Sequence, residues 1–505
     1  MPVPKLYVEG FNMTSNKNKL LRARGSVAII AALGLLLAGC TGDEDESLTA
    51  PSAQQINSPA DIAQESADDY DDNVNGLITG ATLSRWMSDW ENERPAGVEG
   101  RLIVLQATEG DAGTEYIAPI PNQVYTYLVE STEWTQTRSN GVTETVSMVP
   151  DGATMDAFLK KYEINPERDM IVCAMGNGGP LQAMQQGRCW YMFRYWGTPK
   201  ENLAVLNGEN AWLLSSGQMA AGDFSATPST APNTGTFSVR DLPEDNTALQ
   251  ATIDDVFAAV TPVDENVTTD GVMLWDARGL NQYSAGEATE LGQEGCASAY
   301  CGPVADYMTT FQNAGSRQGH PNGALQLQFT HFLDASAGYS YKPKAELAAY
   351  LQGYTDANGI GFVDSSYQPV GPGNAYQPGD TIITYCETTF RAMITGTASA
   401  VILGLPTRFY DGAMTEWNSL SNIVTREGTP ILPADSPWRA DIPTRSFFKP
   451  AADPSLVAPR VIDDPYADNA MAIVFEDRIY KYGVSGDGDT SGGGGVAPPS
   501  NPCGG

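Results

Sequence analysis

One cysteine in this sequence stands where a nucleophile could act. Cys386 directly follows the apolar segment 381–385, and a helical pattern begins five residues later. The loop between them contains Glu387, Thr388, Thr389, Phe390 and Arg391. Backbone N–H groups in such a loop and the N-terminus of the following helix favour negative charge. We therefore expect the thiol to ionise near neutral pH and to act as a nucleophile. The alternative is a buried structural cysteine.

The elements that would position this loop alternate between strands and helices. Short apolar runs predict buried strands at 101–107 and 170–173, and further strands are predicted at 204–206, 271–276, 381–385 and 407–410. Apolar periodicity predicts helices at 155–162, 181–196, 248–259, 344–353 and 391–403. This alternation is typical of α/β proteins, in which mostly parallel sheets are flanked by helices.

The order of elements repeats along the chain. Segments 205–212 and 409–417 each lead from a strand through a glycine to a tryptophan, and each follows a helix that ends in glycine. The sequence therefore predicts a duplicated α/β domain. Its predicted parts are a first domain at 76–222, a linker at 223–244, a second domain at 245–425, an extension at 426–484 and a disordered tail at 485–505.

Residues 1–40 have the pattern of an export signal. A basic segment precedes a short apolar run that ends in Leu37-Ala38-Gly39-Cys40, and this ending resembles the lipidation site of bacterial lipoproteins. An ordinary secretory signal is the alternative. The lipoprotein interpretation predicts lipid on Cys40, a disordered tether at 41–75 and a membrane-anchored, exported protein. It favours the outer membrane, with the periplasmic or the surface face left open, and it permits disulfides.

The charge and the histidine content exclude several classes of partner. The formal net charge is -32, which argues against nucleic-acid binding and against electrostatic docking on anionic lipid. The chain has 2 histidines, His320 and His331, so a multi-histidine metal site is not expected. We expect neither a metal nor a cofactor.

Four segments of the second predicted domain carry a family resemblance. They are Asp276-Ala277-Arg278 with Tyr283, Gly319-His320 to Gly323-Ala324, Tyr385-Cys386 to Arg391, and Tyr410-Asp411-Gly412 to Glu416-Trp417. In this order they resemble the tandem-domain rhodanese family of thiosulfate and 3-mercaptopyruvate sulfurtransferases, over roughly residues 80–425. The resemblance implies two tandem rhodanese-like domains, each a mostly parallel sheet flanked by helices.

The resemblance also implies roles for single residues. Cys386 would carry a sulfane sulfur as a persulfide, residues 387–391 would bind the small sulfur-containing anion, and Arg391 would stabilise charge and close the loop. Arg278 is expected to be a structural ion-pair partner, and His320 a turn residue with no role as a base. The loop is one residue shorter than the C-x5-R loop of phosphatases, which favours sulfur transfer over phosphoryl transfer.

The sequence departs from the family pattern at several positions. The pattern aligns Ala174 of the first domain with Cys386, so that domain is predicted to be inactive. Glu387 places a carboxylate beside the nucleophile, Thr389 replaces the usual glycine, and Met414 stands where a tryptophan is expected. These departures leave a persulfide plausible and leave the sulfur donor open.

The other cysteines are candidates for pairing. The pattern places Cys173 and Cys189 on adjacent elements, where they are either a disulfide or two buried thiols. Cys296 and Cys301, spaced C-x4-C, favour a disulfide over a zinc site because no further ligands are near them in sequence. Cys503 is left unpaired.

The preferred function is therefore sulfur transfer from thiosulfate, 3-mercaptopyruvate or a related donor to a thiophilic acceptor. The alternative is a non-catalytic lipoprotein that serves as a binding or assembly subunit of a cell-surface redox complex. A third reading is processing of other chalcogen oxyanions, such as selenite or tellurite, at the same thiol. The sequence does not discriminate among the three.

Overall fold

The computed structural model describes residues 55–483, except for 108–115, 140–143, 263, 266–270, 294, 305–317, 421–422, 425–435, 437–438, 449–459 and 462–471. All described residues belong to one compact unit, Gln54–Gly505. The predicted signal with Cys40 and the predicted tail with Cys503 lie outside them. No helix within the described ranges has the length and apolar character needed to cross a bilayer.

The first sheet contains five parallel strands. Their order is β1 (Gly76–Ile78), β8 (Leu203–Leu206), β7 (Met170–Ala174), β2 (Leu102–Ala107) and β4 (Val124–Val129). Alternate residues of β2 face opposite layers, because successive side chains of a strand point to opposite sides. Leu102 packs in one core with helix α3 (Gly80–Ser88), and Ile103 packs in the other with α5 (Gly152–Tyr162) and α6 (Pro180–Trp196).

The second sheet repeats this arrangement. Its parallel strands are β10 (Gln250–Ala251), β19 (Thr407–Tyr410), β18 (Thr381–Tyr385), β11 (Val272–Asp276) and β15 (Leu325–Gln326). Helices α8 (Ile253–Ala259), α9 (Leu280–Tyr283) and α13 (Ala413–Ser419) share a core with one face, whereas α11 (Lys344–Leu351) and α12 (Phe390–Gly396) share a core with the other. The α/β class with parallel sheets and flanking helices is confirmed. Both sheets have the same strand order, as a duplicated domain would.

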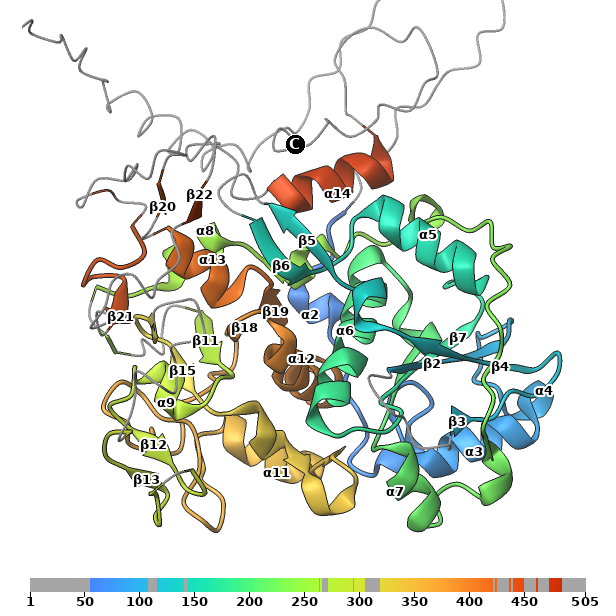
Figure 1. The fold of residues 1–505 in the computed structure, drawn as a ribbon, viewed down its shortest axis with the longest axis horizontal. Helices are drawn as coiled ribbons and strands as arrows, with labels where there is room; N and C mark the ends of the chain where they lie inside the picture. Colours follow the sequence, from blue (N-terminus) through green and yellow to red (C-terminus); the bar gives the residue numbers. More distant parts are fainter. Residues whose placement is uncertain are drawn as a thin grey trace, which may run out of the picture. The chain divides into compact units, whose positions relative to one another are not determined.

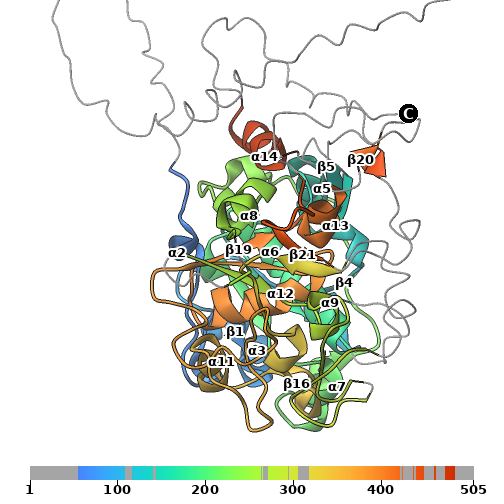
Figure 2. The same ribbon diagram turned by 90° about the vertical axis from the view of Figure 1, so that its left-hand side faces the viewer.

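Helices α6 and α12 join the two halves. They lie side by side between the sheets (Figures 1 and 2) and belong to one continuous hydrophobic core. The contact is close at Gly187, where an added Cβ would lie 2.8 Å from the main-chain oxygen of Met393. The helix that follows the Cys386 loop is therefore packed directly against a helix of the other half.

Smaller elements complete the fold. The helices are α2 (Pro59–Ile62), α4 (Trp90–Glu93), α7 (Asn210–Ser215) and α14 (Ala472–Tyr482). The short paired strands are β3 (Tyr116–Ile117) with β9 (Phe224–Ser225), β5 (Gln136–Ser139) with β6 (Glu144–Met148), β12 (Thr289–Glu290) with β13 (Tyr300–Cys301), β14 (Gly319–Pro321) with β21 (Ser446–Phe448), β16 (Leu333–Asp334) with β17 (Ser340–Tyr341), and β20 (Ile423–Val424) with β22 (Arg460–Val461).

Three sequence-based expectations need correction. The expected disordered tether at 41–75 is wrong for residues 55–75, because Ile62 is fully buried and the backbone N–H of Gln64 donates to Ala400 at 2.7 Å. The expected helix at 248–259 begins only at Ile253, after the edge strand β10. The helix expected at 391–403 starts at Phe390 and becomes a π-helix over Thr397–Ile402.

Candidate functional site

The Cys386 loop lies at the carboxyl edge of the second sheet. Cys386 follows β18, the central strand, and α12 begins at Phe390. The thiol is 1% exposed, and among the described cysteines it is the one that forms no disulfide. Open α/β sheets bind ligands at this edge. The strand therefore delivers an unpaired thiol to the part of the sheet where chemistry is expected.

The carbonyl and N–H groups of the loop backbone differ in their hydrogen bonding. The carbonyl oxygens of Cys386 and Glu387 accept from the N–H groups of Met414 and Thr415 at 3.1 and 3.2 Å. Within the described chain, no acceptor is recorded for the N–H groups of Thr388 to Arg391, which precede or open α12. Unpaired N–H groups around one atom form an anion-binding concavity.

Thr389 sets the shape of this loop. Its φ of 67° lies in the left-handed region, which residues with a Cβ adopt at an energetic cost. Its buried Oγ1 donates to the carbonyls of Tyr410 and Asp411 at 2.9 and 3.0 Å. The family's usual glycine would adopt this conformation without strain. Here the two side-chain hydrogen bonds hold the threonine in place.

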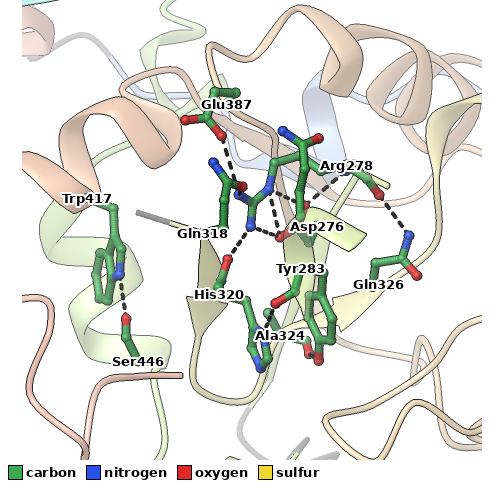
Figure 3. A network of polar contacts seen from close by, with 12 residues as sticks. Asp276, Arg278, Tyr283, Gln318, His320, Ala324, Gln326, Glu387, Trp417 and Ser446 are labelled. Carbon is green, nitrogen blue, oxygen red and sulfur yellow. Dashed lines mark hydrogen bonds and ion pairs between the residues drawn. The ribbon is translucent and has the colours of Figure 1, made fainter. Parts of the chain in front are cut away.

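A buried ion-pair network supports the loop from β11 (Figure 3). Arg278 has no exposed surface, and its Nη2 donates to Asp276 Oδ2 at 2.6 Å. Its Nη1 lies 3.3 Å from Glu387 Oε2. Burial alone would lower the pKa of Arg278, but the charge and hydrogen bonds of Asp276 outweigh it and raise the pKa above its ordinary range. Arg278 is thus a structural cation, and it faces the carboxylate beside Cys386.

Arg391 closes the other end of the loop. Its Nη1 donates to the Oε1 atom of Gln282 on α9, so the side chain ties α12 to α9. Arg391 and Arg278 contribute two positive charges to these contacts, and Asp276 and Glu387 contribute two negative charges. Side-chain charge therefore gives the loop no net attraction for an anion, and the backbone N–H groups must supply it.

His320 is fully engaged in structure. Its two ring nitrogens lie 2.8 Å from the carbonyl oxygen of Tyr283 and from Asp264 Oδ2, and the imidazole stacks on the Tyr283 ring (Figure 3). The residue has no exposed surface. His320 lies in strand β14 and not in the expected turn, and its geometry offers no free nitrogen for proton transfer.

Sequence reasoning missed Arg188, which reaches the loop from the other half of the molecule. This residue of α6 pairs with Asp411 and lies over the ring of Phe390, with its Cζ 5.6 Å from the ring centroid. Asp411 in turn accepts from Thr389 through its carbonyl. An arginine directly before the apolar and aromatic run Cys189–Phe193 was the available signal for a buried partner.

The counterpart of Cys386 in the first sheet also differs from expectation. The glycine turns after β8 and β19 can be aligned, and the strand registers then place Cys173 opposite Thr384. Met175, not Ala174, consequently stands opposite Cys386, because strand register differs by one residue from the alignment of apolar runs. Met175 is buried and lacks a nucleophile, so this edge presents no thiol at that position.

Two disulfides are present. Cys173 pairs with Cys189, joining β7 to α6 in the buried core, and Cys296 pairs with Cys301 beside β12. The described residues contain no group of three or more histidine, cysteine or carboxylate side chains that would hold a metal ion.

Comparison with known proteins gives structural likenesses only. No family model matches the chain, and no curated protein matches it. The solved structures that match include Tum1 from Saccharomyces cerevisiae, at 16% identity and TM-score 0.42, covering 68% of this chain and 95% of that one. A 3-mercaptopyruvate sulfurtransferase from Leishmania major has 14% identity and TM-score 0.40, covering 67% and 73%.

An anaerobic ergothioneine biosynthesis enzyme from Chlorobium limicola also matches, at 14% identity and TM-score 0.44, covering 68% of each chain. All three TM-scores lie below 0.5. The function proposed below therefore rests on the geometry of the site and on the motifs of the sequence.

Proposed function

We propose that this protein is a sulfurtransferase that carries sulfur as a persulfide on Cys386. The observation that supports the proposal most directly is the unpaired thiol of Cys386 beside the N–H groups of Thr388 to Arg391, which have no acceptor among the described residues. A persulfide is anionic at its outer sulfur, and preorganised N–H donors stabilise such charge. A merely structural cysteine would not need this arrangement.

The first half-reaction forms the persulfide. The Cys386 thiolate attacks the outer sulfur of a small anionic donor, and the bond between that sulfur and the rest of the donor breaks. The electron pair leaves with the donor remnant, which is sulfite when the donor is thiosulfate. In the second half-reaction a thiophilic acceptor takes the outer sulfur and restores the thiolate. Neither half-reaction requires a metal or an external oxidant.

Glu387 bears on the choice of donor. Its side chain is 15% exposed and is paired with Arg278, which also pairs with Asp276. A dianion such as thiosulfate meets this negative charge, whereas a donor of lower charge meets less repulsion. We infer that 3-mercaptopyruvate or a related monoanion suits the site better than thiosulfate.

The proposal extends to location. The lipoprotein pattern at Cys40 supports an exported, lipid-anchored chain, and Cys173–Cys189 and Cys296–Cys301 suit an oxidising compartment. Labelling of cells with a fatty-acid analogue tests the anchor. The full-length chain should take up the label, and the Cys40→Ala variant should not.

One assay distinguishes sulfur transfer from a non-catalytic function. Purified protein is incubated with 3-mercaptopyruvate or thiosulfate, cyanide is added, and thiocyanate is measured, with Cys386→Ser as the matched control. Turnover that disappears in the variant supports sulfur transfer. Absence of turnover and of a persulfide with every donor would favour the second candidate, a non-catalytic subunit of a surface redox complex, which Glu387 beside the thiol makes worth testing.

A further inference from the structure

The second histidine of the chain lies at the same sheet edge as Cys386. His331 belongs to the short 3-10 helix η7 (Phe329–Phe332), which directly follows strand β15. Strands β15 and β18 are parallel and flank β11 on its two sides, so the segments after them emerge at one edge. This placement puts η7 beside the Cys386 loop.

Hydrogen bonds and packing fix that neighbourhood. The N–H of Phe329 donates to Ala277 at 3.2 Å, and the N–H of Ala277 donates to Tyr385, the residue before Cys386, at 2.9 Å. Helix α12 also lies against η7. Two strand spacings place the start of η7 roughly 10 Å from Tyr385. The acceptor sulfur that gives up its proton is also the atom that attacks, so the His331 side chain and the Cys386 persulfide must together span most of this distance, with that sulfur between them.

One ring nitrogen of His331 is paired with a carboxylate, and the other has no partner among the described residues. Its Nε2 contacts Oε1 of Glu290, whose side chain is 4% exposed, while the His331 side chain is 20% exposed. Within the described ranges, Nδ1 of His331 has no recorded partner, and the buried Oε2 of Glu290 is likewise unpaired. The pair therefore has solvent access and an unused acceptor on each member.

This pairing selects a tautomer. A carboxylate accepts a hydrogen bond from the ring N–H that it contacts, so neutral His331 carries its proton on Nε2 and keeps a lone pair on Nδ1. The same logic orients the histidine of hydrolase triads. His320 has no such capacity, because both of its nitrogens are engaged and the residue is buried.

We propose that His331 is the general base for the second half-reaction, that Glu290 is its positioning residue, and that the sulfur acceptor is a small thiol. The inference rests on the proposed function of Cys386. Nδ1 removes the acceptor's S–H proton, and the resulting thiolate attacks the outer sulfur of the Cys386 persulfide. The bond between the two persulfide sulfurs breaks, its electron pair stays on Cys386 Sγ as thiolate, and the acceptor leaves as a persulfide anion. Two sulfur anions enter the step and two leave it, and the proton ends on His331.

The test separates the two half-reactions in the full-length protein. Cys386 is loaded with 3-mercaptopyruvate, excess donor is removed, and 2-mercaptoethanol or sulfite is added while the persulfide is followed by mass spectrometry. Sulfite carries no S–H proton, so it needs no base. We expect His331→Gln to slow discharge to 2-mercaptoethanol roughly 10²-fold, the lower end for general-base catalysis, and to leave discharge to sulfite unchanged. Glu290→Gln should slow the thiol reaction in the same selective way.

Controls keep the outcomes distinct. Thr330→Ala alters the neighbouring residue of η7 and should leave both discharge rates unchanged, and loading by the donor shows that each variant retains a folded site. Equal slowing with both acceptors would reveal a structural role and overturn the proposal, as would an unchanged thiol rate. A wild-type chain that never acquires the persulfide would refute the proposed function itself, and this inference with it.

Discussion

Arg188 of α6 donates to both carboxylate oxygens of Asp411, at 2.7 and 3.1 Å, and neither side chain has any exposed surface. The same carboxylate accepts from the N–H of Val149 at 2.6 Å. Because Asp411 also receives the hydroxyl of Thr389 through its carbonyl, the pair joins the first half of the molecule to the Cys386 loop. The half without a thiol thus supports the geometry of the half that has one.

Replacement of Arg188 by methionine should destabilise the protein strongly. The change leaves Asp411 buried without a counter-charge, and breaking a buried pair in this way costs about 3–5 kcal/mol in the free energy of unfolding. Urea denaturation measures it. Arg85→Met is a matched control, because Arg85 pairs with Glu93 at the surface and its loss should cost less than about 1 kcal/mol. Similar losses in the two variants would contradict the assigned role.

Thr389 should tolerate glycine better than alanine. Alanine loses both hydroxyl hydrogen bonds and keeps the strained left-handed φ, which should cost about 1–3 kcal/mol of unfolding free energy. Glycine loses the same bonds but relieves the strain, so it should lie closer to wild type. Thermal unfolding ranks the two. An alanine variant at least as stable as the glycine variant would show that φ is not strained in solution.

Neutralising Glu387 should favour the more highly charged donor. Glu387→Gln removes one negative charge near the thiol, worth about 2 kcal/mol for a dianion near 4 Å in water, or roughly thirtyfold in kcat/KM for thiosulfate. The gain with 3-mercaptopyruvate should be smaller, and salt should shrink both gains. If kcat/KM rose equally for both donors, or for neither, electrostatic repulsion by Glu387 would not determine which donor the protein prefers.

Lys481 on the C-terminal helix α14 should make the stability of the protein depend on pH. Burial lowers the pKa of Lys481 to about 8, although its ammonium group donates to the carbonyl of Trp196 at 2.8 Å. The unfolded chain binds this proton more tightly, so the free energy of unfolding rises as pH increases from about 8 towards the unfolded pKa near 10.4. Between pH 7 and 10, wild type should gain up to about 3 kcal/mol relative to Lys481→Met. Denaturant titrations at a series of pH values measure this gain. If the free energies of unfolding of wild type and of Lys481→Met changed with pH in the same way, Lys481 would be exposed to solvent in the folded protein.

Much of the fold could be read from the sequence because central parallel strands are buried on both faces. Continuous apolar runs such as 101–107 and 170–173 therefore marked β2 and β7 with little error. The two-residue strands β10 and β15 were missed, because elements this short carry no pattern of their own. Residues 55–75 looked polar enough to be disordered, yet their hydrogen bonds reach residues 400–402, contacts that composition does not show.

At the candidate site, too, residues in local sequence motifs could be predicted, whereas contacts between distant residues could not. Cys386 and the Asp276–Arg278 pair occupy local motifs, so their placement was open to prediction. The pairs Arg188–Asp411 and His331–Glu290 join residues 223 and 41 positions apart, and only the tertiary structure brings them together. The misassigned partner of Cys386, Ala174 instead of Met175, arose because strand register, and not the ends of apolar runs, determines which residues correspond.

The central claim is that Cys386 carries sulfur, and one measurement tests it directly. Full-length protein is treated with 3-mercaptopyruvate, or separately with thiosulfate, and the peptide containing Cys386 is analysed by mass spectrometry under non-reducing conditions. This peptide should gain the mass of one sulfur atom, cyanide should remove that sulfur, and the Cys386→Ser variant should show no gain. If the Cys386 peptide of folded protein stays unmodified after treatment with every donor, Cys386 does not carry sulfur.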